Sequence, residues 1–294
     1  MLRLAVVGFL PALLLHAQSP CELAECLDAL ARTAATFAAT APGLMAEETL
    51  DQRGRHGFYE ALKKKKFKDL DLKLPPDFRT HHVISSYALA EIGEAHALHE
   101  VRTIVSMDGR SLTTAADAGR ALTTRLQSND DHIRRQLLED LQHDQLEGAV
   151  TDFGPLILLF TERSRKDYTF DIVGEQHLGQ EPVVILGYRQ ISGEHGLTVF
   201  NERTEERQPA SGQIWLRQKD LLPIRITMNT EEPLTKKLTI RTMALVDYMP
   251  SPFGLVPTSV IHMQFLSVGL TSHSLMVEND FHYSDFHKIR AMIP

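Results

Sequence analysis

The chain has 294 residues, of which 43% are hydrophobic and 23% charged, and this composition excludes a disordered or collagen-like protein. Because 31 basic side chains stand against 38 acidic ones, the formal net charge of −7 disfavours a nucleic-acid binder. Two cysteines are too few for a disulfide scaffold or a four-thiolate zinc site.

The first residues have the pattern of a secretory signal peptide. Arg3 provides a positive charge, residues 4–15 are apolar, Gly or Pro, and Ala17 is a small residue at a plausible cleavage point. The apolar stretch is shorter than the about 20 residues that span a bilayer. We predict that residues 1–17 are cleaved and that residues 18–294 form a single periplasmic or secreted domain. The alternative is an uncleaved anchor or a buried strand.

Cys21 and Cys26 lie near the start of the predicted mature chain, where an oxidising compartment would allow a disulfide. A continuous helix would hold the two residues too far apart, so pairing would require a non-helical turn at residues 22–25. In the alternative, Cys26 is a small buried residue of the first helix. The sequence leaves both possibilities open.

Apolar residues from Leu23 to Ala38 recur at helical spacing and predict an amphipathic helix that ends near Pro42. A strand is expected at residues 45–53. A dense basic run follows, and it could contact anionic lipid head groups, although short charged runs are usually solvated surface. This run comprises Lys63, Lys64, Lys65 and Lys66.

Two further strands are predicted at residues 82–89 and 98–107, and Asp108-Gly109 marks the turn after them. A helical insert at about residues 112–147 follows. Within it, Ser128 supplies N-cap chemistry, and an apolar stripe beyond this cap predicts a helix. The stripe consists of Ile133, Leu137, Leu138 and Leu141.

Nearly all of the chain after Phe153 is predicted as strand. Short polar turns separate the segments, so neighbouring strands should be antiparallel. The predicted segments are 156–160, 168–175, 183–191, 213–218, 223–229, 238–247, 256–268 and 275–283.

Side chains alternate within these strands: Ile214 and Leu216 face one way, and Trp215 faces the other. The alternation predicts a sheet with one apolar and one polar face. We therefore predict an α+β fold, in which a large curved antiparallel sheet of roughly ten or eleven strands is covered by two or three helices. The first helix and a helix at residues 133–141 are the expected covers of the apolar face.

No motif in the sequence specifies an enzyme. The Gly-x-Ser-x-Gly elbow, the P-loop and the dinucleotide fingerprint are absent. His96, His99 and Glu100 lack the His-Glu-x-x-His spacing, so we expect no metal site. The carboxylate pairs at residues 47–48, 130–131, 205–206 and 231–232 are predicted as solvated surface. We expect neither catalysis nor a cofactor.

The order of strands and turns in the C-terminal half resembles the outer-membrane lipoprotein carrier (LolA/LolB-like) superfamily. The resemblance rests on residues 212–226, which place the segment 222–226 (LPIRI) after a polar turn, and on Tyr248 and the Phe253-Gly254 turn. It spans about residues 150–290. The turn at residues 107–110 also looks like that of a group of secreted bacterial proteins. The greater length and the helical insert depart from the typical carrier.

The resemblance implies a half-open antiparallel barrel with a helical lid, whose apolar concave face binds acyl chains of a lipid or lipoprotein. Methionines would let such a cavity adapt to its ligand. The alternative is a cell-envelope structural or interaction module with a fully packed core and no ligand. The residues expected to line the cavity are Ile214, Leu216, Ile226, Met228, Met243, Met263 and Phe265.

Overall fold

The structure is a computed structural model that describes residues 21–58, 61, 77–92, 97–128, 130, 132–133, 136–137, 152–192, 197–201, 204–268 and 272–289. The predicted signal peptide, the lysine run at residues 63–66 and most of the helical insert after residue 128 lie outside these ranges. None of the helices in the described ranges is long and apolar enough to cross a membrane.

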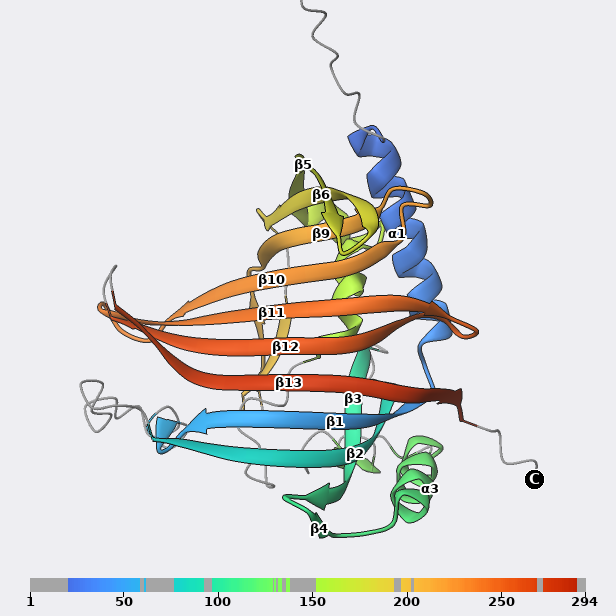
Figure 1. Cartoon of the computed structure of the whole chain (residues 1–294), viewed down its shortest axis with the longest axis vertical. Helices are drawn as coiled ribbons and strands as arrows, with labels where there is room; N and C mark the ends of the chain where they lie inside the picture. Colours follow the sequence, from blue (N-terminus) through green and yellow to red (C-terminus); the bar gives the residue numbers. More distant parts are fainter. Residues whose placement is uncertain are drawn as a thin grey trace, which may run out of the picture.

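Eleven strands form one antiparallel sheet that is not closed, in the order β4-β3-β2-β1-β13-β12-β11-β10-β9-β6-β5 (Figure 1). The N-terminal strand β1 therefore lies beside the C-terminal strand β13 in the interior of the sheet. Strands β7 (Leu197–Asn201) and β8 (Thr204–Gln208) form a separate pair. The strands of the large sheet are β1 (Leu44–Arg55), β2 (Phe78–Ile92), β3 (Ala97–Met107), β4 (Arg110–Ser111), β5 (Tyr168–Leu178), β6 (Glu181–Gln190), β9 (Ser211–Arg217), β10 (Pro223–Pro233), β11 (Leu238–Ser251), β12 (Gly254–Val268) and β13 (Ser272–Lys288).

The prediction of a large antiparallel sheet with helices is confirmed. Most predicted strands lie within observed ones, which extend a few residues further at one or both ends. The strand predicted at residues 156–160 is wrong, because this segment is the 3-10 helix η2 (Gly154–Phe160). A short continuous apolar run does not distinguish a buried strand from a buried helical turn. Pro155, in the first turn of η2, favours the helical alternative.

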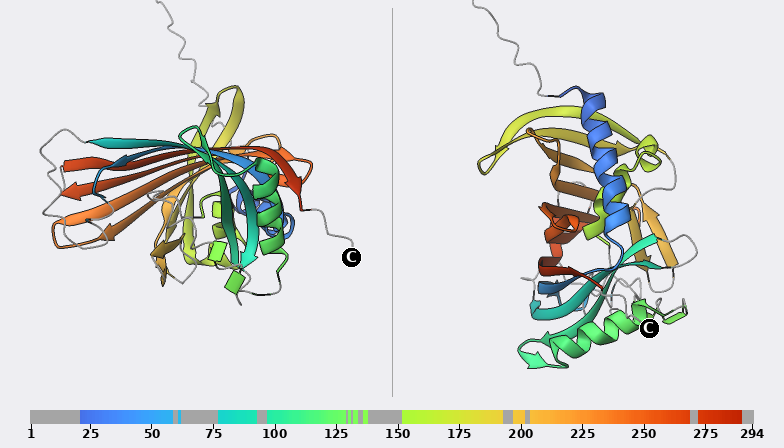
Figure 2. Two further views of the ribbon diagram at one scale, coloured as in Figure 1. Left: turned by 90° about the horizontal axis from the view of Figure 1, so that it is seen from below. Right: turned by 90° about the vertical axis from the view of Figure 1, so that its right-hand side faces the viewer.

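Helix α1 (Leu23–Thr40) and η2 pack against each other and cover one face of the sheet. Figure 2 shows the sheet bending around α1. The buried stripe of α1 has the helical spacing that the sequence predicts. A second 3-10 turn, η3 (Ser164–Asp167), connects η2 to the edge strand β5. The elements that cover this face therefore come from two separate segments: α1 precedes strands β1–β4 in the sequence, and η2 and η3 follow them.

Helix α3 (Ala115–Leu126) covers the opposite face of the sheet, against β2 and β3. Met45 packs with Leu122 and Leu137 in one cluster, whereas its neighbours Leu44 and Ala46 belong to the cluster under α1. Successive strand residues point to opposite faces, so this end of the sheet is covered on both sides. The prediction that the residues around Leu137 help α1 cover the same face is wrong, because η2 occupies that place.

A disulfide joins Cys21 to Cys26, with their Cα atoms 6.1 Å apart. Helix α1 begins at Leu23, so Cys21 precedes the helix and Cys26 lies in its first turns. A non-helical turn over residues 22–25 is therefore not required. The N-cap residue Glu22 makes no capping hydrogen bond through its side chain. The disulfide thus ties the chain to the helix at an end that lacks a side-chain cap.

Substitution of Gly212 tests the close approach of β9 and β10. A Cβ atom at Gly212 would overlap the carbonyl oxygen of Thr227, so the two strands would have to separate. We expect G212A to lower the free energy of unfolding by about 3 kcal/mol in urea denaturation. The control is Gly119 in α3, where a Cβ would lie 3.7 Å from Ser86 Oγ. G119A should stabilise by about 0.5–1 kcal/mol. An unchanged midpoint for G212A would contradict this packing.

Candidate functional site

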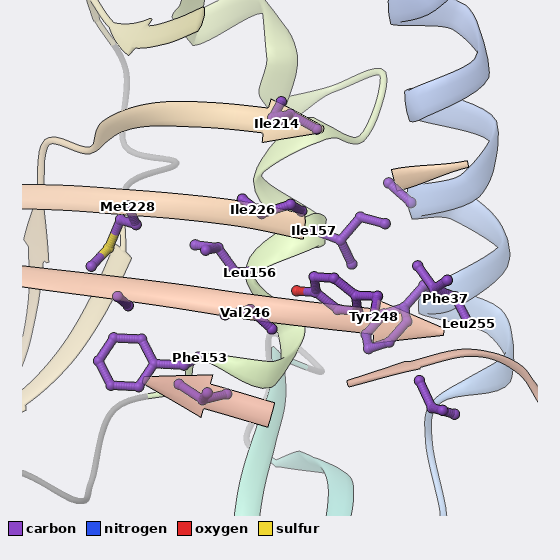
Figure 3. Close-up of a cluster of buried hydrophobic side chains, with 14 of the residues drawn as sticks. Phe37, Phe153, Leu156, Ile157, Ile214, Ile226, Met228, Val246, Tyr248 and Leu255 are labelled. Atoms are coloured by element: carbon purple, nitrogen blue, oxygen red, sulfur yellow. The ribbon is translucent and has the colours of Figure 1, made fainter. Parts of the chain in front are cut away.

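The face of the sheet under α1 and η2 is the largest apolar surface of the described structure. Its side chains from β9, β10 and β11 meet Phe37 of α1 and Leu156 and Ile157 of η2 (Figure 3). Four of the residues expected to line a cavity lie here and have no exposed surface. They are Ile214, Leu216, Ile226 and Met228.

The other three expected residues lie on the opposite face. Met243 pairs with Met263 across β11 and β12, while the adjacent Ala244 and His262 point toward the covered face. Phe265 likewise precedes Leu266, which packs in a buried cluster with Ile240. All three are half-buried. Because side chains alternate along a strand, Met243, Met263 and Phe265 do not share a surface with Ile214.

Half-buried apolar side chains border the covered face at its β5 end, and we call this set the apolar rim. Phe170 and Ile172 alternate with the exposed Asp171 and Val173 along β5, the last strand of the sheet. Figure 1 places the N-terminal end of α1 beside β5, β6 and β9. The apolar rim consists of Leu23, Leu27, Leu158, Leu159, Phe170, Ile172, Leu221 and Leu222, all packed against the core.

A buried ionic cluster lies near the other end of the sheet, on the same face. Arg102 of β3 donates from Nε to both carboxylate oxygens of Glu48 at 2.7 Å, and its Nη2 is 3.4 Å from Glu100 Oε2. The side chains of all three residues are at most 3% exposed. Burial would lower the pKa of Arg102, but the carboxylates of Glu48 and Glu100 raise it well above its ordinary value. Arg102 is therefore a fixed positive charge between two acids.

Glu100 attaches the cover to the sheet. Its carboxylate accepts hydrogen bonds from the backbone N–H groups of Phe153 and Gly154, each at 3.1 Å, and from Tyr87 Oη at 2.8 Å. The hydroxyl of Tyr248 donates to the carbonyl of Gly154 at 2.9 Å. Burial raises the pKa of Glu100 to about 7, opposed by Arg102. The start of η2 is therefore held by polar contacts inside an apolar layer.

Gly154 permits this attachment because it has no side chain. A Cβ atom there would lie 2.5 Å from Glu100 Oε1 and 3.0 Å from Tyr87 Oη. Just before it, Asp152 accepts from the backbone N–H of Glu100 at 2.7 Å and contacts His99 Nδ1 at 2.7 Å. The chain therefore approaches the sheet closely at residues 152–154, and the attachment includes both backbone and side chains.

The sequence-based interpretation missed this cluster. Glu48 was expected on the solvated surface, but it is 1% exposed on a strand face between Ala46 and Leu50. Glu100 and Arg102 lie two residues apart, so they share one face of β3, and this spacing was the available signal. Within the described ranges, no group of three His, Cys, Asp or Glu residues is placed to hold a metal ion.

A second polar group lies in the middle of the covered face. Gln52 Nε2 donates to Asn279 Oδ1 at 2.8 Å, and Asn279 Nδ2 is 3.2 Å from His262 Nδ1. His262 has no exposed surface, and its ring packs against that of Phe153 with 4.7 Å between centroids and 33° between the ring planes. Burial lowers the pKa of His262 to about 3. The imidazole is therefore neutral at physiological pH.

Comparisons with known proteins leave the function open. No family model matches the chain, and no curated protein matches it. A crystal structure of a DUF1329 family protein from Desulfovibrio piger is similar over 90% of this chain and 92% of that chain. The identity is 9% and the TM-score is 0.36. A likeness this distant carries no argument about function.

Proposed function

We propose that the protein is an exported, non-catalytic carrier that binds the acyl chains of a lipid or lipoprotein between the apolar face of the sheet and its cover. The apolar rim carries this proposal. It is a border of partly exposed apolar side chains from α1, η2, β5 and the turn between β9 and β10. An acyl chain that enters such a surface gains about 0.8 kcal/mol for each buried methylene.

The attachment of η2 supports the same function. Phe153 and Gly154 at the start of η2 are bonded to Glu100 near one end of the sheet. Leu158 and Leu159, near the end of η2, belong to the apolar rim at the other end. Phe160 at the end of η2 is fully buried against three aromatic rings, so an acyl chain that enters at the apolar rim would displace the half-buried Leu158 and Leu159 and leave the rest of the cover in place.

Recovery of bound lipid is the direct test. Mature protein purified from an exporting host should carry stoichiometric acyl species, which native mass spectrometry and lipid extraction would identify. Lipid-free protein should bind a fluorescent fatty-acyl probe, and the bound probe should be released on unfolding. If the purified protein carries no lipid and also does not bind the probe, the carrier function is overturned.

A pair of substitutions on β5 tests the position of the acyl site. Ile172 belongs to the apolar rim, whereas the adjacent Val173 is 51% exposed on the other face. We expect I172D to weaken binding of the acyl probe at least tenfold, because a carboxylate beside the acyl chain would lose its hydration. V173D adds the same charge to the same strand and should leave the affinity within about twofold. Equal affinities for the two variants would place the site elsewhere.

An interaction module of the cell envelope is the second candidate. One observation favours it: Ile214, Leu216, Ile226 and Met228 are fully buried under α1 and η2, as expected for a filled core. In that case I172D and V173D would differ in stability alone, and no acyl species would copurify. The probe measurement therefore separates the two functions.

A further inference from the structure

His262 has an unused hydrogen-bonding atom at the centre of the covered face. It lies on β12, the sixth strand of eleven in the sheet order, far from both edges. Its Nε2 atom is buried and has no hydrogen-bond partner. An unsatisfied buried polar atom is uncommon in folded proteins and requires an explanation.

The hydrogen-bond chain determines which ring nitrogen carries the proton. Asn279 Oδ1 accepts from Gln52, so the amide group of Asn279 presents Nδ2 as a donor to His262 Nδ1. A nitrogen that accepts a hydrogen bond is unprotonated, and a neutral imidazole then carries its proton on the other nitrogen. His262 Nε2–H is thus a donor without an acceptor.

We propose that His262 Nε2–H donates a hydrogen bond to the carbonyl oxygen of an ester- or amide-linked acyl ligand bound on the covered face. This inference rests on the proposed carrier function and assigns the polar contact within that site. Met228 and Val246 lie on the same face close to His262, and they would contact the hydrocarbon while the imidazole binds the carbonyl.

The surroundings of His262 select a neutral acceptor. Burial disfavours the imidazolium, so the ring offers no positive charge to a carboxylate. A free fatty-acid anion would lose its hydration there without a compensating cation, whereas an ester or amide carbonyl needs a single donor. The ring of Phe153 packs at a tilt against His262, and the backbone N–H of Phe153 donates to Glu100. The start of η2 would stay bonded to Glu100, and the ligand would reach Nε2 along the covered face from the apolar rim.

Two lipids that differ in the carbonyl alone test the proposal. 1-Monolauroylglycerol has an ester carbonyl, and 1-O-dodecylglycerol has the same chain on an ether oxygen. Dissociation constants would be measured by displacement of a fluorescent acyl probe from the full mature chain. Wild type should bind the ester about tenfold more tightly, the usual effect of one buried hydrogen bond. In H262F the two lipids should bind equally.

A second measurement uses the wild-type protein and requires no variant. With ¹⁵N-labelled histidine, the ester should shift the Nε2–H resonance of His262, and the ether should leave it nearly unchanged. Circular dichroism would establish that H262F folds, since the substitution removes the contact between Asn279 Nδ2 and His262 Nδ1. Equal affinities of wild type for both lipids would overturn the role of His262 and leave the carrier function standing. Failure of wild type to bind either lipid would overturn both.

Discussion

Replacing Arg102 by methionine should lower the free energy of unfolding by about 3–5 kcal/mol at pH 8. The side chains of Arg102, Glu48 and Glu100 are at most 3% exposed, so the variant would leave two carboxylates in the apolar layer without a cation. The guanidinium also lies over the rings of Tyr87 and Phe281, at 5.3 and 5.4 Å from their centroids. Methionine would preserve part of the volume but supply no charge. Urea denaturation would measure the loss.

Arg241 provides the control for this prediction. Its guanidinium pairs with Glu231, and the two side chains are 44% and 58% exposed. R241M should change the free energy of unfolding by less than about 1 kcal/mol, because exposed ion pairs contribute little. The loss of stability in R102M should also be smaller at pH 5, since the carboxyl groups of Glu48 and Glu100 can protonate there. A deficit that is equal to that of R241M, or independent of pH, would contradict a buried ionic cluster.

The protein should lose stability in acid through His262. Burial lowers the pKa of this imidazole to about 3, whereas an unfolded histidine has a pKa near 6.5. The unfolded state therefore binds a proton first as the pH falls from about 6.5 to about 3. The stability that His262 contributes is fully present above this window, and about 3 kcal/mol of it should be lost by pH 4.

The variant H262F removes the contribution of His262 to the pH dependence of stability. Unfolding free energies measured at pH 7 and pH 4 should differ less in H262F than in wild type, by about 3 kcal/mol. His177 on β5 is exposed, and H177Q serves as the control that should retain the wild-type difference. Glu100 acts in the opposite direction. Its pKa of about 7 lies above the unfolded value, so its contribution is present below about pH 4.5 and is lost as the pH rises through 7. Equal acid sensitivity of H262F and wild type would contradict a buried neutral imidazole.

The strands could be predicted because their signals are local. Alternation and turn residues such as Asp108-Gly109 act within a few positions, and β3 ends at Met107 as expected. The ionic cluster depends on partners far apart in sequence: Arg102 and Glu48 are separated by 54 residues. Taken alone, the sequence of β1 or of β3 places a charged residue among apolar ones, and this pattern fits a solvent-exposed charge as well as a buried ion pair. The prediction that Met243 and Met263 lie on the covered face was wrong for a similar reason, because strand periodicity does not tell which face of a sheet is covered.

The place of β13 has a consequence for how the chain acquires its structure. This strand pairs with β1 on one side and β12 on the other, so it joins the two halves of the sheet. Gln52 and Asn279, which bond across the β1–β13 pair, are 227 residues apart. Contacts of such long range slow folding, because the entropy of closing a long loop is lost before the contacts can stabilise the chain. The apolar face cannot be assembled until β13 is available, so a chain that crosses a membrane from its N-terminus would reach its native topology only after β13 has crossed.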